Sequence, residues 1–272
     1  MIMRRKLYLI ISDGGGNTPL RGVHIDKDNF LNFFKSPEGG AWKDDEILVF
    51  ENNDFDLNIL RINDLNARVD EKPIDFYLIV YCGHGFTDQN HHIIFEVRQD
   101  FQLNLDDLLG AVAQSRCLVI ADSCRAIYHL QEGGRIADLR IFSTSEDARN
   151  SAYADLCREM YNNLIEATPP KMQVVYFSNS YGETADENPR DGGVYSHELL
   201  AAAKRQIIEF RALQQHNCNS YYATIDEIHA EAAGMVMNKT HNRQHPEIYL
   251  DCRSKARLPF VVVPHWQLQL DD

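Results

Sequence analysis

Two reactive side chains follow two of the apolar runs of this sequence. His84 comes after the run Phe76–Cys82, and Cys124 comes after the run Cys117–Ala121. If the two runs are neighbouring strands of a parallel sheet, both side chains emerge at the edge where open α/β sheets bind their ligands. A free thiol is mostly protonated at neutral pH, and an adjacent imidazole can take its proton and later give it to a leaving amine. The pair therefore predicts thiol catalysis, with Cys124 as nucleophile and His84 as its base.

The residues beside this pair suit the same chemistry. Gly85 lets the backbone approach a substrate closely, and we expect the N–H groups of Gly85 and Cys124 to bind an oxyanion developing on an attacked carbonyl. Arg125 is expected to pair with a loop carboxylate. Taken singly, His84 is better explained as a buried ring and Cys124 as a core cysteine. Their joint occurrence at corresponding strand ends favours the catalytic interpretation.

The elements that must position the pair alternate along the chain, because helical patterns separate the short apolar runs. This alternation predicts an α/β fold with helices on both faces of a sheet. The β-branched and aromatic content of the runs favours buried strands over helices. The predicted strands are Leu7–Ile11, Ile47–Phe50, Phe76–Cys82, Cys117–Ala121, Val174–Ser178 and Phe260–Val263, with His91–Val97 as a strand of a small hairpin.

Apolar spacing and capping residues predict the helices. Asn104 is a good N-cap for one helix, and Thr224 opens a capping box with Glu227 in another. Asp26 or Asp28 can cap an earlier helix. The predicted helices are Asn29–Lys35, Asp56–Val69, Leu105–Gln114, Ala152–Ala167, Ser196–Gln215 and Thr224–Asn238.

The length and composition suit one globular domain over residues 1–272. Residues 132–172 form a long connection, which we interpret as a linker or insertion. A second polar connection covers residues 179–193. Long loops on an α/β scaffold are usually functional or mobile.

The chain is acidic, with a formal net charge of −13 at pH 7. This charge repels phosphate, which argues against a nucleic-acid partner and is compatible with a cationic peptide substrate. No apolar run approaches the length of a membrane span, and the run Leu7–Ile11 is too short for a signal sequence, so no membrane partner is expected. The six cysteines form no CxxC pair, which indicates reduced thiols and a cytoplasmic protein.

The sequence predicts no cofactor and no metal site. The glycine-rich segment 12–18 lacks both the lysine of a phosphate loop and the spacing of a dinucleotide-binding turn. His91 and His92 are adjacent on a predicted strand and point to opposite faces, so they form a poor zinc site with His84. The acidic residues after Cys124 are scattered, whereas a calcium loop gathers them within a short segment.

Five ordered blocks of the sequence resemble the caspase and metacaspase family. Leu78–Gly85 resembles the histidine strand of both, and Val119–Cys124 resembles the cysteine strand of metacaspases. The other blocks are Leu20–Asp26, then Gly182–Glu187 with Gly192–Ser196, and the closing segment with His245-Pro246 and Leu258–Phe260. The resemblance covers nearly the whole chain and is closest to bacterial caspase-like and metacaspase proteins. It implies a three-layer α/β sandwich with a six-stranded, mostly parallel sheet, and cleavage of peptide bonds by a Cys–His dyad.

The resemblance also implies which residue precedes the cleaved bond. Asp26 and Asp122 match acidic pocket positions of metacaspases, and Ser178 and Glu183 fall in the matching substrate-binding region. Two carboxylates favour a guanidinium or ammonium group and repel an aspartate, so we expect cleavage after Arg or Lys. Arg21 lies one position from a pocket arginine of caspases, which leaves an aspartate-specific protease as an alternative.

Two more functions are compatible with this fold. One is a catalytically idle interaction module, which the intact pair of His84 and Cys124 argues against. The other is a ligase or transpeptidase that uses the same dyad. For a protease, we expect restraint by a regulatory or sensor protein, by a ligand, or by self-cleavage. Self-cleavage in the connection 132–172 could use the basic residues Arg135, Arg140, Arg149 and Arg158.

Overall fold

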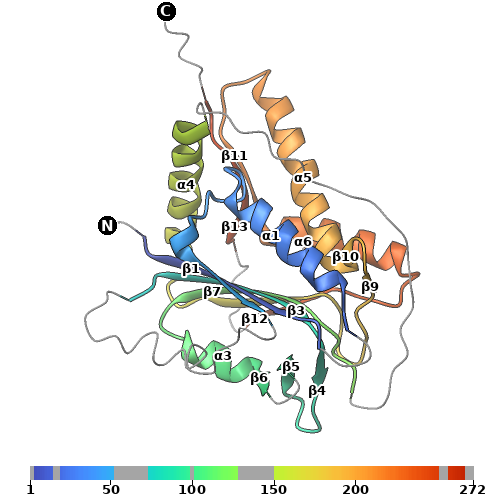
Figure 1. Cartoon of the computed structure of the whole chain (residues 1–272). Coiled ribbons are helices and arrows are strands. Elements are labelled where there is room, and N and C mark those ends of the chain that lie inside the picture. The colour runs from blue at the N-terminus through green and yellow to red at the C-terminus, as the bar shows by residue number, and fades with distance from the viewer. Residues whose placement is uncertain are drawn as a thin grey trace, which may run out of the picture.

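A six-stranded sheet with the order β12-β8-β7-β3-β1-β2 forms the centre of the protein, as Figure 1 shows. The structure is a computed structural model that describes residues 3–14, 19–51, 73–98, 101–127, 150–250 and 257–266. Strands β2, β1, β3, β7 and β8 run parallel, whereas β12 is antiparallel to β8. The strands are β1 (Arg5–Ser12), β2 (Ile47–Glu51), β3 (Phe76–Gly83), β7 (Arg116–Asp122), β8 (Gln173–Phe177) and β12 (Glu247–Leu250).

The sheet lies between two layers, because successive residues of each strand point to opposite faces. Leu7 and Leu9 of β1 pack in one apolar cluster with four helices, and Tyr8 and Ile10 pack in a second cluster on the other face. In Figure 1, α1, α4, α5 and α6 cover the first face, while α3 and the sheet β4-β5-β6 cover the second. These elements are α1 (Gly22–Lys35), α3 (Leu105–Ala111), α4 (Asn150–Glu166), α5 (Val194–Gln214), α6 (Ile225–Lys239), β4 (Gly85–Thr87), β5 (Ile93–Arg98) and β6 (Phe101–Asn104). The predicted three-layer α/β sandwich is confirmed.

One predicted strand does not belong to the central sheet. The run Phe260–Val263 lies in β13 (Pro259–Val263), which pairs with β11 (Tyr221–Thr224) in a separate two-stranded sheet. The sixth place in the central sheet belongs to β12. The apolar run of this edge strand has only the three residues Ile248–Leu250, and Ile248 and Tyr249 are exposed, so the run is shorter than those by which the other strands were predicted.

Helices α4, α5 and α6 lie within two residues of their predicted bounds, whereas α3 ends at Ala111 and not at Gln114, and α1 begins well before its predicted start. Asn104 caps α3 by accepting the N–H of Asp106, and Thr224 forms the predicted capping box of α6. Helix α1 begins at Gly22, so Asp26 and Asp28 lie inside the helix and neither caps it. The predicted helix Asp56–Val69 lies outside the described residues. None of the helices that the structure describes is long and apolar enough to span a membrane.

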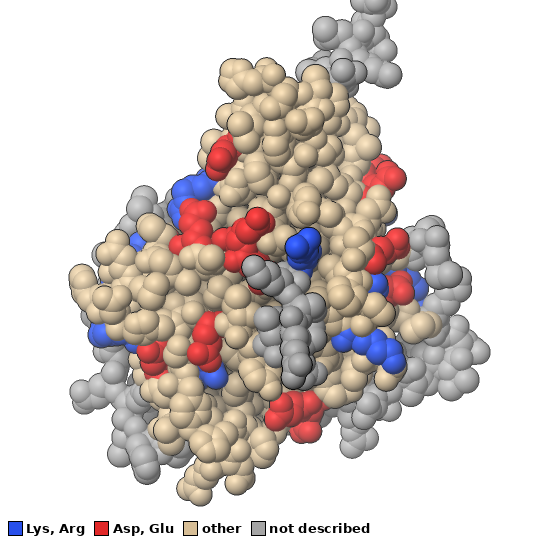
Figure 2. Space-filling view, turned by 180° about the vertical axis from the view of Figure 1, so that it is seen from behind, with Lys and Arg blue, Asp and Glu red and all other residues tan. Residues whose placement is uncertain are grey.

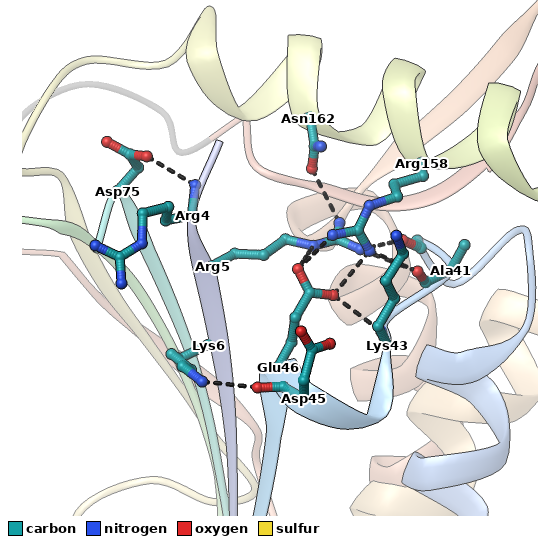
Figure 3. A network of polar contacts seen from close by, with 11 residues as sticks. Arg4, Arg5, Lys6, Ala41, Lys43, Asp45, Glu46, Asp75, Arg158 and Asn162 are labelled. Atoms are coloured by element: carbon teal, nitrogen blue, oxygen red, sulfur yellow. Dashed lines mark hydrogen bonds and ion pairs between the residues drawn. The ribbon is translucent and has the colours of Figure 1, made fainter. Parts of the chain in front are cut away.

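A buried ion-pair cluster, called the Arg5 cluster, lies at the amino-terminal edge of the parallel strands and is drawn in Figure 3. It consists of Arg5 in β1, Arg158 in α4, and Glu46 in the short 3-10 helix η1 (Asp44–Glu46). Arg5 Nε lies 3.3 Å from Glu46 Oε1, and Arg158 Nη1 lies 2.7 Å from Glu46 Oε2. The Arg5 guanidinium also donates to Asn162 of α4 at 3.0 Å and lies 4.2 Å from the centre of the Trp42 ring. The cluster ties α4 to the start of the first strand.

Candidate active site

The ends of β3 and β7 bring His84 and Cys124 to one edge of the sheet. The two strands are parallel neighbours, which was the condition for this arrangement, and Cys82 is paired in register with Asp122. The chain that leaves each strand continues beside the other, because the Thr87 N–H donates to the Ala126 carbonyl at 3.1 Å. His84 and Cys124 therefore follow equivalent strand ends.

The backbone of His84 is fixed by two hydrogen bonds to its carbonyl oxygen. The Tyr81 hydroxyl donates to it at 2.5 Å and the Glu96 N–H at 3.0 Å. The imidazole lies against Gly14, where a Cβ would collide with the ring and where φ is +77°. The described part of the glycine-rich turn thus packs on the histidine, which explains the need for glycine there.

Close packing also surrounds Gly85, the predicted oxyanion donor. A Cβ at this position would lie 3.0 Å from both the Cys124 carbonyl oxygen and the Ser123 hydroxyl, and 3.1 Å from the Ile94 carbonyl oxygen. A side chain would force apart the two segments that carry His84 and Cys124. Glycine thus keeps the backbone beside the nucleophile close-packed.

The Cys124 sulfur contacts the main chain of Ala185. The Ala185 N–H donates to the sulfur at 3.4 Å, and the thiol lies 3.9 Å from the Ala185 carbonyl oxygen. Burial raises the pKa of the thiol; the Ala185 N–H opposes this shift, and nearby carboxylates, led by Asp122, add to it. The Cys124 thiol is therefore protonated at neutral pH and needs a base to become a thiolate.

Three carboxylates form an acidic cluster near Cys124: the buried Asp26 of α1, the buried Asp122 at the end of β7 and the partly buried Glu187 in β9 (Glu187–Asn188). Asp26 accepts the Gly193 N–H at 2.9 Å, and Glu187 accepts the Gly22 N–H at 3.0 Å. Burial, followed by the charge of Asp122, raises the pKa of Asp26 well above its usual value. Burial also raises the pKa of Glu187, and Asp122 adds to that shift. The charge of Asp122 thus makes both neighbouring carboxyl groups harder to ionise.

Asp122 is the central member of the acidic cluster. Its Oδ2 accepts the Ser196 N–H at 2.9 Å and the Ser196 hydroxyl at 2.7 Å. Burial raises the pKa of Asp122, although hydrogen bonds from Ser196 and Ser178 lower it in part. The predicted pocket residue Ser178 thus lies beside Asp122, and its hydroxyl oxygen is also 3.3 Å from the Ser123 carbonyl oxygen, so its single proton can be given to either group.

Two glycines make room for these carboxylates. A Cβ at Gly192, where φ is +92°, would collide with Asp26, and a Cβ at Gly193 would collide with Asp122. Both glycines form β10 (Gly192–Gly193), which pairs with the strand that carries Glu187. Sequence reasoning selected Asp26 and Asp122 but not Glu187, although Glu187 lies inside a block that carries the family resemblance.

Other predicted residues lie around the acidic cluster without joining it. Glu183 accepts the N–H and the ring Nδ1 of His245, at 2.8 and 2.6 Å. Arg125 is buried, pairs with Glu247 and stacks on Phe177 at 4.1 Å, so it has the structural role that was expected. Arg21 is exposed and immediately precedes α1.

Figure 2 shows acidic and basic side chains interspersed over the described part of one face. Among the residues that the structure describes, no group of three or more His, Cys, Asp or Glu side chains could hold a metal ion.

Comparisons with known proteins agree with this architecture. The family model of the caspase domain matches residues 5–257. The crystal structure of caspase-1 from Spodoptera frugiperda is similar over 91% of this chain and 88% of that chain, with a TM-score of 0.55 and 15% sequence identity. At that identity the likeness establishes the fold alone. A search of the curated proteins finds no match. The chain therefore belongs to the caspase domain family of cysteine peptidases.

Proposed function

We propose that this protein is a cysteine endopeptidase that cleaves after Arg or Lys. The observation that carries the proposal is the acidic cluster, because its central carboxylate lies two residues before the nucleophile Cys124. In this reading Cys124 attacks the carbonyl carbon of the scissile bond. His84 is the base that takes the thiol proton.

The proposed reaction has two steps. In the first, the thiolate adds to the carbonyl, the N–H groups of Gly85 and Cys124 donate to the oxyanion, and the imidazolium of His84 protonates the leaving amine. In the second, His84 takes a proton from water, which hydrolyses the thioester and restores the thiol. Protein or peptide substrates follow from this chemistry.

Selectivity follows from the charge of the acidic cluster. Its described hydrogen-bond donors are main-chain N–H groups and hydroxyls, which leave the negative charge uncompensated by a cation. A guanidinium or ammonium group compensates it and can pair with more than one carboxylate. An aspartate side chain would add a like charge, so the acidic cluster disfavours the aspartate-specific alternative.

We also propose control by self-cleavage, at fewer sites than the sequence suggested. Arg158 is held in the Arg5 cluster inside α4, so its peptide bonds are in a regular helix that a protease cleaves poorly. The other basic candidates of the connection, Arg135, Arg140 and Arg149, lie outside the described residues. Replacing these three by glutamine and following the length of the active enzyme by mass spectrometry would show whether they are cut.

Matched fluorogenic peptides test the proposed function. They differ only in the residue before the reporter: Arg, Lys, Asp, or citrulline, the neutral isostere of Arg. We expect cleavage after Arg and Lys, about 100-fold or more less after citrulline, and none in Cys124→Ala. Replacing the exposed Cys218 by serine is the control that should retain activity. Cleavage after Asp would refute the assigned selectivity. If an arginyl chloromethyl ketone does not alkylate Cys124, the result would support the catalytically idle interaction module.

A further inference from the structure

The main chain of Ala185 is held against the nucleophile by the residues on either side of it. Ala185 belongs to the connection between β8 and β9, and its N–H lies 3.4 Å from the Cys124 sulfur. This distance is suitable for an N–H donor and a sulfur acceptor. The Arg125 N–H donates to the Glu183 carbonyl at 2.9 Å, so the connection also pairs with the residue after the nucleophile.

The first attachment of this connection is Glu183. One of its carboxylate oxygens accepts the N–H groups of Ser180 and His245, at 3.1 and 2.8 Å, and the other lies 2.6 Å from the His245 ring nitrogen. These bonds close the turn before Ala185 and join it to the segment that leads into β12. Burial is the largest single effect and raises the pKa of Glu183, but the contacts with His245 and the Ser180 N–H together outweigh it and lower the pKa, so this carboxylate is ionised at neutral pH.

The second attachment is Asp186, on the other side of Ala185. Its carboxylate lies 2.7 Å from Arg243 Nη2, and its N–H donates to the Gln244 side chain at 3.0 Å. Gln244 also donates to the Ser178 carbonyl at 2.8 Å. Three consecutive residues, 243–245, thus bind the connection on both sides of Ala185. These contacts hold the main chain around Ala185 more firmly than the main chain of a typical exposed loop.

The negative charges around the Cys124 sulfur give the Ala185 N–H a role in stabilising the thiolate. The carboxylates of Asp122, Asp186 and Glu96 lie near Cys124 and disfavour a thiolate there. A hydrogen bond to the charged form has the opposite effect. The Ala185 N–H is such a donor, and the proposed reaction does not transfer its proton.

We propose that the Ala185 N–H donates to the Cys124 thiolate, and that Glu183 and Asp186 are positioning residues that keep this donor in place. The inference rests on the proposed function in taking Cys124 as the nucleophile. It assigns Glu183 to the support of the nucleophile, although the sequence predicted contact with the substrate. His245 and Arg243 complete the support from the segment before β12.

The test compares Arg243→Ala, Glu183→Gln and the double variant with the unchanged chain. Arg205→Ala is the matched control, because it breaks an Arg–Glu pair of 2.6 Å between α5 and α6. The first readout is the rate of Cys124 alkylation by iodoacetamide against pH, measured on the Cys124 peptide by mass spectrometry. The second is kcat and KM for an Arg peptide. Circular dichroism and thermal melting verify that each variant is folded.

We expect the double variant to be alkylated about five- to tenfold more slowly at pH 7, with its rate profile moved to higher pH. kcat should fall by a similar factor while KM stays within about twofold, since the acidic cluster is untouched. Arg243→Lys should recover most of the rate, and the control should not change.

Two outcomes would overturn the inference. An unchanged alkylation profile in the folded double variant would show that the donor needs no support from Glu183 and Asp186. Faster alkylation and a higher kcat would show that the connection shields the sulfur. The alkylation profile does not require peptide cleavage, so a protein that cleaves no peptide but shows the expected shift would refute the proposed function and leave this inference standing.

Discussion

Two buried charged clusters occupy opposite edges of the same sheet and differ in how their charge is balanced. The Arg5 cluster at the amino-terminal edge contains both signs, because Glu46 lies between Arg5 and Arg158. The acidic cluster at the carboxyl-terminal edge has one sign, and N–H groups and hydroxyls are its described partners. A structural cluster completes its own pairs inside the fold. Among the described residues the acidic cluster has no cation partner, and under the proposed function the substrate supplies one.

The pKa values of the carboxylates follow this difference. Burial alone would raise the pKa of Glu46, but its hydrogen bond to Arg158 and the charge of Arg5 outweigh burial and lower it. Burial and the neighbouring carboxylates raise the pKa of Asp26 and of Glu187. A carboxylate is thus stabilised as an anion at the amino-terminal edge of the sheet and destabilised as an anion at the carboxyl-terminal edge.

The largest expected effect is on catalysis, from Asp122→Asn. Removing the central charge leaves a buried cation of the substrate without its main partner, which costs about 4 kcal/mol, or roughly 1,000-fold in kcat/KM for an Arg peptide. The free energy of unfolding should stay the same or rise, because less like charge is buried. Steady-state kinetics and urea denaturation measure the two quantities. An equal loss for the citrulline peptide would contradict a role for charge.

The next largest effect is on stability, from Arg5→Met. Glu46 then keeps only part of its compensation, and we expect the free energy of unfolding to fall by about 3 kcal/mol. The kcat/KM of the folded fraction should remain within about twofold of the original. Lys6→Met is the control, because Lys6 lies on the same strand and its Nζ donates to the Asp45 carbonyl oxygen at 2.7 Å in an exposed hydrogen bond. A kinetic loss without a stability loss would break the proposed division between the two clusters.

Glu187→Gln should have a smaller effect than Asp122→Asn. Glu187 is only partly buried and lies farther along the connection, so we expect about a tenfold loss in kcat/KM for the Arg peptide, or about 1.4 kcal/mol. Cleavage of the citrulline peptide should change less. If kcat/KM falls by the same factor for both peptides, Glu187 positions the main chain through its hydrogen bond with Gly22 and does not attract the cation.

The smallest expected effect is an opposite pH dependence of the two clusters. The pKa of Asp26 is raised in the folded state, so its contribution to stability is present below its unfolded pKa near 3.8 and is lost as the pH rises through the folded value. The pKa of Glu46 is lowered, so its contribution is present above its unfolded pKa near 4.5 and is lost as the pH falls through the folded value. Urea denaturation between about pH 3 and 8 should show the first loss vanish in Asp26→Asn and the second in Glu46→Gln. Parallel shifts in both variants would contradict the comparison.

The sequence was most informative where one element determines both structure and chemistry. The apolar runs before His84 and Cys124 predict two strands, and the register shows that these strands are parallel neighbours. Asp122 was selected through the family resemblance, because its position matches an acidic position of metacaspases. The exposed edge strand β12 was not recognised, because its apolar run has only the three residues Ile248–Leu250.

Other parts of the site depend on contacts between distant segments, which one sequence does not show. Glu187 joins Asp26 only because two short antiparallel strands fold beside α1. Ala185 has no functional group in its side chain, so its contact with sulfur through the main chain leaves no trace in the residue type. The start of α1 was placed too late because no side-chain cap marks Arg21.

Gly192 and Gly193 have a consequence for how selectivity can change. Since any side chain at either position would occupy the volume held by Asp26 or Asp122, most substitutions there would obstruct the acidic cluster before they altered its charge. If the proposed function holds, mutational routes to a different substrate preference are therefore expected to avoid these glycines.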